Sequence, residues 1–217
     1  MAWLIAVAST KGFTEEGLTF PPTITPPASA KCLTLIGNGV TDMTIETILV
    51  KFSAIAVYVE PEIAKHLQAW KGKPASELVA EGSSYFSDFV DAPVQKLVIV
   101  GIIKGIRGSA YAGGFESSIR DRLAYDDKYE EEEEAKLEEL VKYLSTHNLP
   151  VGCSIFFHWP SPSAVQVTVS PDGSVPKQPG NSTENENIAK FLLHWLIGEN
   201  SVSESTALST AEGVAAS

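Results

Sequence analysis

The chain has 217 residues, of which 44% are hydrophobic, and its 16 Lys and Arg against 27 Asp and Glu leave a formal charge of -11. A chain of this length can bury one substantial core, so we expect a single domain over residues 1–217. The acidic balance would repel a phosphate backbone or an anionic membrane surface, so we expect no nucleic acid and no membrane as partners. No apolar run in the sequence is long enough to cross a bilayer.

The beginning of the chain resembles a signal peptide only superficially. The residues AVA at 6–8 look like a cleavage site, but the segment lacks a basic start and its apolar part is at the short limit. The composition of a transit peptide, rich in Arg and Ser, is also missing. The two cysteines, Cys32 and Cys153, match no metal-binding or redox spacing. We therefore expect a reduced, cytoplasmic protein that needs no metal and no cofactor.

Strand patterns begin after a proline-rich segment at residues 21–27, which favours a loop or extended chain. Segments rich in β-branched and aromatic residues then predict strands at 32–36, 43–60, 96–103, 153–159 and 164–169. The second segment exceeds an ordinary strand, so we expect a turn near Glu46 and Thr47.

Helical patterns fall between and after these strands, at residues 61–70, 75–90, 110–123, 126–144 and 183–198. Gly82 weakens the second of them. Strands followed by helices without strict alternation indicate an α+β fold with a mainly antiparallel sheet that helices cover on one face.

The helix ends carry their own signals. We expect Asp126 or Asp127 to cap the fourth helix, and Ser182 or Thr183 to cap the fifth. The five successive glutamates at 130–134 fit a solvated helix face better than a metal site or a site for a basic partner. Beyond residue 201 we expect one weak helix at most, with flexible ends at 1–16 and 204–217.

The stretch IGNGVTDMTIE, at residues 36–46, raises the question of a phosphate-binding loop. A dinucleotide loop needs a third glycine and a following helix, whereas this stretch leads into another strand. We interpret Gly37 and Gly39 as turn residues instead. The four histidines have no metal-ligand spacing and no nucleophile motif appears, so local motifs identify no catalytic residue.

Longer blocks resemble the chalcone isomerase family of plants. VKFSAIAVYVE (50–60), AWKGKPASEL (69–78) and PPTITPPASAKCLTLIGNGV (21–40) are similar to successive segments of that family, and the resemblance extends from about residue 17 to about residue 203. The block RDRLAYDDKYEEEEEAKLEELV (120–141) resembles the non-catalytic, type IV chalcone isomerase-like proteins. The resemblance implies an open-faced β-sandwich whose large antiparallel sheet is covered by helices, with a ligand cleft between the two layers.

In the family's enzymes, the phenolate oxygen of a chalcone adds across its own enone to form a flavanone. The resemblance places the family's functional positions at Thr41, Ser53, Tyr111, Ser118, Trp195 and Leu196. Thr41 stands where the enzymes have the arginine that holds the phenolate, and a neutral side chain offers no charge-assisted hydrogen bond. Ser53 and Tyr111 keep the hydroxyls that polarise the ketone, Ser118 is shorter than the family's asparagine, and Trp195 adds bulk. Without the resemblance, Tyr111, Ser53 and Trp195 would be read as ordinary structural residues.

The resemblance implies a non-catalytic protein, expected to be a monomer, that binds a chalcone or flavanone such as naringenin chalcone or naringenin and assists chalcone synthase. Two alternatives stay open. The first is an active chalcone-flavanone isomerase in which Lys104 or Arg107 supplies the missing charge. The second is a fatty-acid-binding member of the family. In those members an arginine and a tyrosine bind the carboxylate, and Thr41 stands in place of the arginine.

Overall fold

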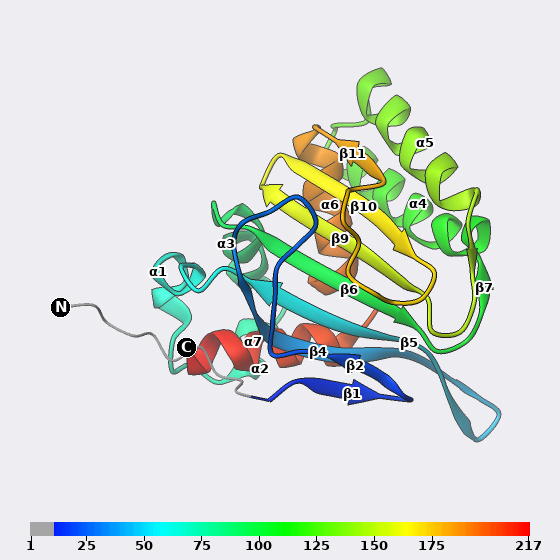
Figure 1. The fold of residues 1–217 in the computed structure, drawn as a ribbon. Coiled ribbons are helices and arrows are strands. Elements are labelled where there is room, and N and C mark those ends of the chain that lie inside the picture. Colours follow the sequence, from blue (N-terminus) through cyan, green and yellow to red (C-terminus); the bar gives the residue numbers. More distant parts are fainter. Residues whose placement is uncertain (1–10) are drawn as a thin grey trace.

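The computed structural model describes residues 11–217, so the signal-like residues 6–8 lie outside the described part of the chain. Its main sheet has seven strands in the order β11-β10-β9-β6-β5-β4-β3, and every neighbouring pair is antiparallel (Figure 1). The strands are β3 Thr23–Ile24, β4 Leu33–Ile45, β5 Ile48–Val59, β6 Lys96–Ile102, β9 Ser154–Ser161, β10 Ala164–Ser170 and β11 Asn181–Thr183. Two small ribbons pair β1 Phe13–Glu15 with β2 Leu18–Phe20, and β7 Ile106–Arg107 with β8 Asn148–Leu149.

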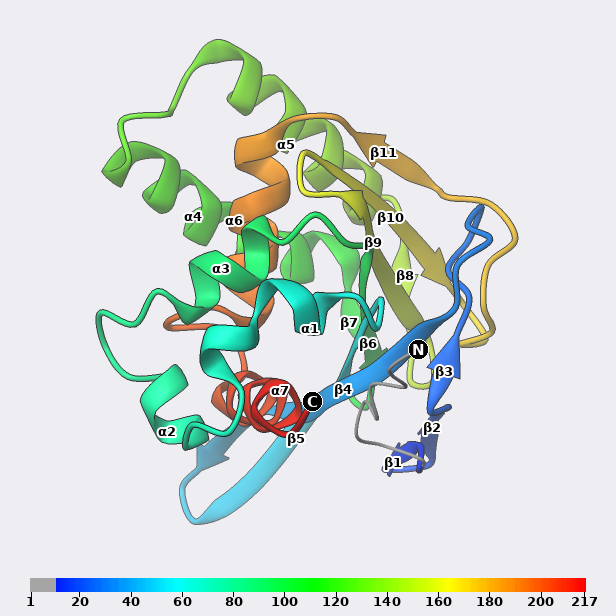
Figure 2. The ribbon, with the colours of Figure 1, turned by 90° about the vertical axis from the view of Figure 1, so that its left-hand side faces the viewer.

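The helices gather on one side of this sheet, as Figure 2 shows. They are α1 Ile63–His66, α2 Ala75–Leu78, α3 Tyr85–Asp91, α4 Gly108–Tyr125, α5 Glu131–Ser145, α6 Glu186–Ile197 and α7 Glu204–Ala216, with the 3-10 helix η1 Gln68–Trp70 after α1. The predicted helix over 75–90 is two short helices, because the chain turns at Gly82 with a φ of +77°. The predicted α+β fold, an antiparallel sheet covered by helices, is confirmed.

The two faces of β5 explain why its sequence is almost continuously apolar. Ile55, Val57 and Val59 belong to the large core between sheet and helices. The alternating residues Ala54, Ala56 and Tyr58 belong to a smaller core on the opposite face, beneath the N-terminal strands. A strand buried on both sides lacks the apolar and polar alternation of a half-exposed one.

The turn predicted near Glu46 and Thr47 is confirmed. Strand β4 ends at Ile45 and β5 begins at Ile48, and Glu46 adopts a φ of +59°. The prediction that Gly37 and Gly39 form a turn is wrong, because both lie inside β4, where Gly37 pairs with Val57 and Gly39 with Ile55.

These two glycines stand in the strand because α7 lies directly against it. A Cβ atom on Gly37 would come within 2.2 Å of the Thr210 Oγ1 atom, and one on Gly39 within 2.5 Å of the Thr206 amide nitrogen. Any larger residue would push the helix away from the strand. The stretch that resembles a phosphate loop is therefore the part of β4 against which α7 packs.

Hydroxyl groups of the C-terminal segment form hydrogen bonds with backbone groups of β4 that have no strand partner. The Asn38 amide donates to Ser209 Oγ at 3.1 Å, the Val40 amide donates to Ser205 Oγ at 3.1 Å, and Ser203 Oγ donates to the Val40 carbonyl at 2.6 Å. The expectation of a flexible end at 204–217 is therefore wrong. Since α7 has little apolar surface, side-chain hydrogen bonds to an edge strand stabilise it where a hydrophobic stripe would be expected.

The predicted helix caps are also wrong. Helix α5 begins at Glu131, after the expected caps, and Asn185 rather than Ser182 or Thr183 caps α6, since its Oδ1 accepts from the Ile188 amide at 3.0 Å. The predicted end of α6 before Gly198 is confirmed.

The run of five glutamates is not uniformly solvated, contrary to the prediction. Glu133 is only 7% exposed and accepts hydrogen bonds from the side-chain amides of Asn185 and Asn187, at 3.2 and 2.9 Å. Glu134 forms an ion pair with Arg120 at 2.6 Å. Part of the run therefore joins α5 to α6 and α4.

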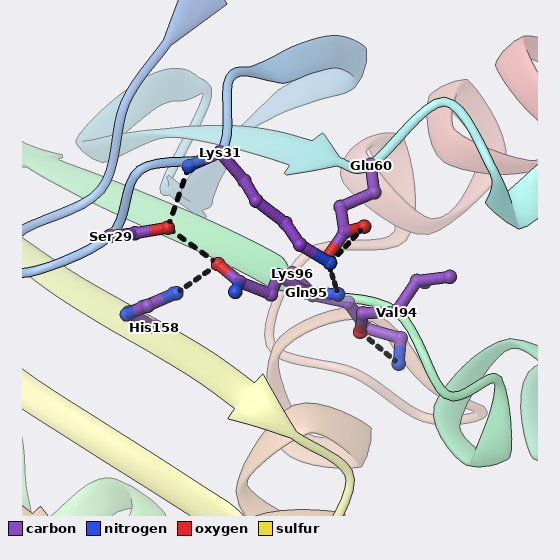
Figure 3. A network of polar contacts seen from close by, with 7 residues as sticks. All are labelled: Ser29, Lys31, Glu60, Val94, Gln95, Lys96 and His158. Atoms are coloured by element: carbon purple, nitrogen blue, oxygen red, sulfur yellow. Dashed lines mark hydrogen bonds and ion pairs between the residues drawn. The ribbon is translucent and has the colours of Figure 1, made fainter.

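A buried polar network joins the ends of the central strands that lie away from the β4–β5 turn (Figure 3). The buried carboxylate of Glu60 accepts from Lys31 Nζ at 2.9 and 2.8 Å and from the Gln95 amide at 2.8 Å. The Gln95 Oε1 atom accepts from Ser29 Oγ at 2.9 Å and lies 3.2 Å from His158 Nε2. These bonds join the N-terminal loop to β5, β6 and β9 and leave the other end of the sheet open for a cavity.

Candidate functional site

A cavity of about 410 Å³ lies between the sheet and the helices, within the size range of small-molecule sites. It is lined by Thr41, Phe52, Ser53, Ile55, Val100, Ile102, Lys104, Gly105, Ile106, Ala110, Tyr111, Trp195 and Val202. The inward-facing residues of β4, β5 and β6 form its floor. The chain from β6 into α4, the end of α6 and the loop before α7 form its walls.

Thr41 and Ser53 form the polar part of the floor. They are direct partners across β4 and β5, and the pairing register shifts immediately after Thr41, as at a β-bulge. Their hydroxyl oxygens lie 2.6 Å apart. One hydroxyl hydrogen is used in this bond, and within residues 11–217 no other hydrogen bond involves either group, so the second hydrogen can be donated to a ligand.

Two aromatic rings, those of Tyr111 and Trp195, form the wall on the helix side, and the buried ring of Phe115 packs against both. The ring of Trp195 meets Tyr111 edge to face, with centroids 5.9 Å apart, and meets Phe115 with centroids 5.7 Å apart. Trp195 is 8% exposed and therefore belongs to both the core and the cavity. Burial raises the pKa of Tyr111, so its phenol stays neutral and can donate a hydrogen bond at physiological pH.

Lys104 is the only residue with a charged side chain among those that line the described cavity. Its amide donates to the Phe52 carbonyl at 3.0 Å, and its Nζ atom lies 5.9 Å from the centroid of the Phe52 ring. Arg107, the other cation considered from the sequence, is exposed and is not part of the lining. Of the two candidates, the structure brings only Lys104 to the cavity.

Two of the residues predicted from the resemblance lie elsewhere. Ser118 lies in a separate groove on the outer side of α4 and α6, together with His194, and Leu196 is fully buried in the large core. Thr41, Ser53, Tyr111 and Trp195 are brought together, whereas Ser118 and Leu196 are not.

Sequence reasoning missed Phe52 and Val202, which line the cavity, and Phe115, which packs against two residues of the lining. Phe115 follows Tyr111 by four residues on the same face of α4, and this spacing is a signal for a shared wall. Phe52 precedes Ser53 on β5 and reaches the cavity near its mouth. Val202 lies in the loop before α7, and nothing in its local pattern points to the cavity.

No cluster of metal-binding side chains occurs among residues 11–217. In the same part of the chain, none of the helices has both the length and the apolar character required to span a membrane.

An antiparallel sheet, covered on one face by helices and enclosing an apolar cavity with a few hydroxyls, defines the class of open-faced β-sandwiches with a ligand-sized cavity. A solved structure of the Arabidopsis thaliana fatty-acid binding protein has this fold, with a TM-score of 0.73 and 17% identity over 94% of this chain and 98% of that one. Residues 15–216 match the family described as Chalcone-flavanone isomerase. The chain belongs to the chalcone isomerase family.

Relatives within the family differ in how similar they are. Chalcone isomerase-like protein 2 of Humulus lupulus is 41% identical over 92% of this chain and 93% of the relative. The chalcone–flavanone isomerase of Hordeum vulgare is 32% identical over 92% of this chain and 87% of the relative. The chain is thus more similar to this chalcone isomerase-like protein than to this isomerase, which agrees with the branch predicted from residues 120–141.

Proposed function

We propose that this protein is a non-catalytic chalcone isomerase-like protein of flavonoid biosynthesis, which binds a chalcone or flavanone in the cavity and assists chalcone synthase. Naringenin chalcone and naringenin are the ligands to test first. The observation that carries the proposal is Thr41: the ketone-binding hydroxyls of Ser53 and Tyr111 are present, but a neutral residue replaces the arginine of the enzymes. We also propose that the protein acts in the cytoplasm as a monomer.

The missing arginine has an energetic consequence. A hydrogen bond to a charged group contributes roughly 1.5 to 3 kcal/mol, so its loss alone would slow ring closure by roughly tenfold to over a hundredfold. In this chain the hydroxyls of Thr41 and Ser53 share one hydrogen bond, so together they offer a ligand one hydroxyl hydrogen and no charge. The wall of Trp195 and Phe115 further restricts the bent geometry that the reacting atoms need.

The test measures binding and turnover on the same sample. Titration with naringenin chalcone and naringenin should give saturable binding, and ring closure, corrected for the spontaneous reaction, should be accelerated little or not at all. Acceleration by many orders of magnitude would show that the protein is an isomerase. Absence of binding to both ligands would refute the ligand assignment.

Contact with chalcone synthase requires an exposed surface, and the tip of the β4–β5 hairpin extends beyond the body of the protein (Figure 1). Met43, Ile45, Ile48 and Leu49 on this tip are 59, 49, 66 and 57% exposed. Exposed apolar side chains in one place favour a protein contact. The double variant Ile48→Ser and Leu49→Ser should weaken capture of purified chalcone synthase without changing ligand binding, and unchanged capture would exclude the tip as the contact.

The second candidate, an active isomerase with a displaced cation, is favoured by one observation, the presence of Lys104 in the cavity lining. It predicts measurable ring closure that Lys104→Gln abolishes. If the wild-type protein closes the ring and this variant is equally fast, a displaced cation at Lys104 is excluded.

A further inference from the structure

Residue 41 of the cavity lining is a neutral threonine, but the lining carries one cation, Lys104, at a different place. Lys104 follows the end of β6, on the side of the cavity away from β4. We propose that Lys104 binds an ionised oxygen of the ligand at the cavity mouth, so that the protein selects the phenolate form of an aromatic ligand. This inference rests on the proposed function and adds to it the binding residue and the charge state of the ligand.

The backbone places this lysine next to the polar floor. Ser53 is paired with Ile102 across β5 and β6, and the carbonyl of Phe52 accepts from the amides of Ile103 and Lys104 at 2.9 and 3.0 Å. The backbone of Lys104 is therefore held two residues beyond Ile102, the strand partner of Ser53. Its Nζ atom lies 5.9 Å from the Phe52 ring, within the range of a cation–π contact.

The charge of Lys104 is available to a ligand. No carboxylate lines the cavity, and among the described residues no salt bridge involves Lys104. The chain as a whole carries a formal charge of -11, which repels anions at long range. An anionic ligand needs a local cation against this background, and Lys104 is the one that the lining provides.

The position of this cation differs from the position that the enzymes' arginine would occupy. In the family's enzymes the arginine at the position of Thr41 would act from β4, whereas Lys104 acts from beyond β6. A phenolate held at Lys104 would lie beside the end of β6 and not at Thr41 on β4, with Tyr111 and Trp195 in the same lining. The charge would thus act from a different strand than the one that carries Thr41.

Two matched variants test the inference. Lys104 and Arg107 are both exposed, but only Lys104 lines the cavity, so Lys104→Gln removes the charge at the cavity and Arg107→Gln removes a charge outside it. The ligands are naringenin chalcone and its fully O-methylated ether, which has no phenol left to ionise. Dissociation constants are measured by titration calorimetry at low and at high salt, and thermal unfolding confirms that both variants are folded.

We expect Lys104→Gln to weaken binding of the chalcone about three- to tenfold at low salt, and less at high salt, because the pair is partly solvated. Arg107→Gln should change it less than about twofold, as for a screened surface charge. The ether should bind wild type and Lys104→Gln equally. If Lys104→Gln binds the chalcone as tightly as wild type does, the inference is overturned and the proposed function stands.

Two further outcomes are distinguishable. If wild type binds neither the chalcone nor naringenin, the proposed function fails, and the phenolate assignment fails with it. If wild type binds laurate more tightly than the chalcone, and Lys104→Gln loses the laurate, Lys104 holds a carboxylate and the phenolate assignment is overturned.

Discussion

Thr41 and Ser53 face each other across β4 and β5 with their hydroxyl oxygens 2.6 Å apart, so the two positions to which the family resemblance assigns phenolate and ketone binding are bonded to each other. This pair is compatible with a bound ligand but provides no charge. The variants below test what each part of the cavity and its supports contribute.

Thr41→Arg should restore a cation at this site. If the rest of the cavity is competent, ring closure of naringenin chalcone should become at least about tenfold faster, because a charged hydrogen bond to the phenolate contributes roughly 1.5 to 3 kcal/mol. Thr44→Arg, on the exposed part of the same strand, is the control for added charge. Equal rates in both variants would assign the inactivity to the aromatic wall instead.

Trp195→Ala should remove one aromatic wall of the cavity. Truncating a buried tryptophan costs about 3 to 5 kcal/mol of unfolding free energy, so denaturant titration should show a large loss of stability. Trp195→Phe keeps an aromatic ring and should lose much less. If Trp195→Ala is as stable as wild type, the packing of Trp195 against Phe115 and Tyr111 does not support the fold.

Two glycine substitutions should have opposite effects on the free energy of unfolding. Gly37→Ala places a Cβ atom 2.6 Å from the Cα atom of Thr210, so α7 must shift, and we expect a loss of about 1 to 3 kcal/mol. Gly113→Ala, in an open position within α4, should instead stabilise by about 0.4 to 1 kcal/mol. Chemical denaturation of the two variants provides the comparison, and a stable Gly37→Ala would mean that α7 moves without cost.

His194 should make stability depend on pH. Burial, together with the nearby charges of Arg122 and Lys190, lowers the pKa of His194 from 6.5 to about 4. Because the folded pKa lies below the unfolded one, the unfolded chain binds the proton more readily, and stability is lost as the pH falls from 6.5 toward 4. The shift corresponds to a loss of about 2 kcal/mol between pH 7 and pH 5.

The check is unfolding free energy at both pH values for wild type and His194→Gln. The variant should lose about 2 kcal/mol less than wild type over this interval. His66→Gln, at an exposed position, should behave like wild type. Parallel losses in all three proteins would show that His194 is not the group responsible.

Much of the fold could be predicted from the sequence because its central strands have a strong local signal. The seven residues of β6 are all buried, and the turn between β4 and β5 is marked by polar residues within an apolar run. Helix α7 could not be predicted in the same way. Its serines and threonines are stabilised by bonds to the edge of β4, and no local pattern tells which strand is at the edge.

The same limit applies to the site. The resemblance led to Thr41, Ser53, Tyr111 and Trp195, which the structure places around one cavity, but their roles stay predictions. It did not reveal that Ser118 lies in a different groove, because this depends on how α4 and α6 pack against each other. Likewise, five identical glutamates give no sign that Glu133 is the one that turns inward.

The contact between β4 and α7 also restricts which mutations can accumulate. Because a Cβ atom at residue 37 would meet Thr210 and one at residue 39 would meet Thr206, a larger side chain on the strand becomes tolerable only after the helix has changed. Positions 37 and 210, and positions 39 and 206, are therefore expected to vary together among relatives. In relatives whose α7 differs in sequence, residues 36–39 should differ too. The residue at position 41, on the same strand, should then lie at a different place relative to the cavity.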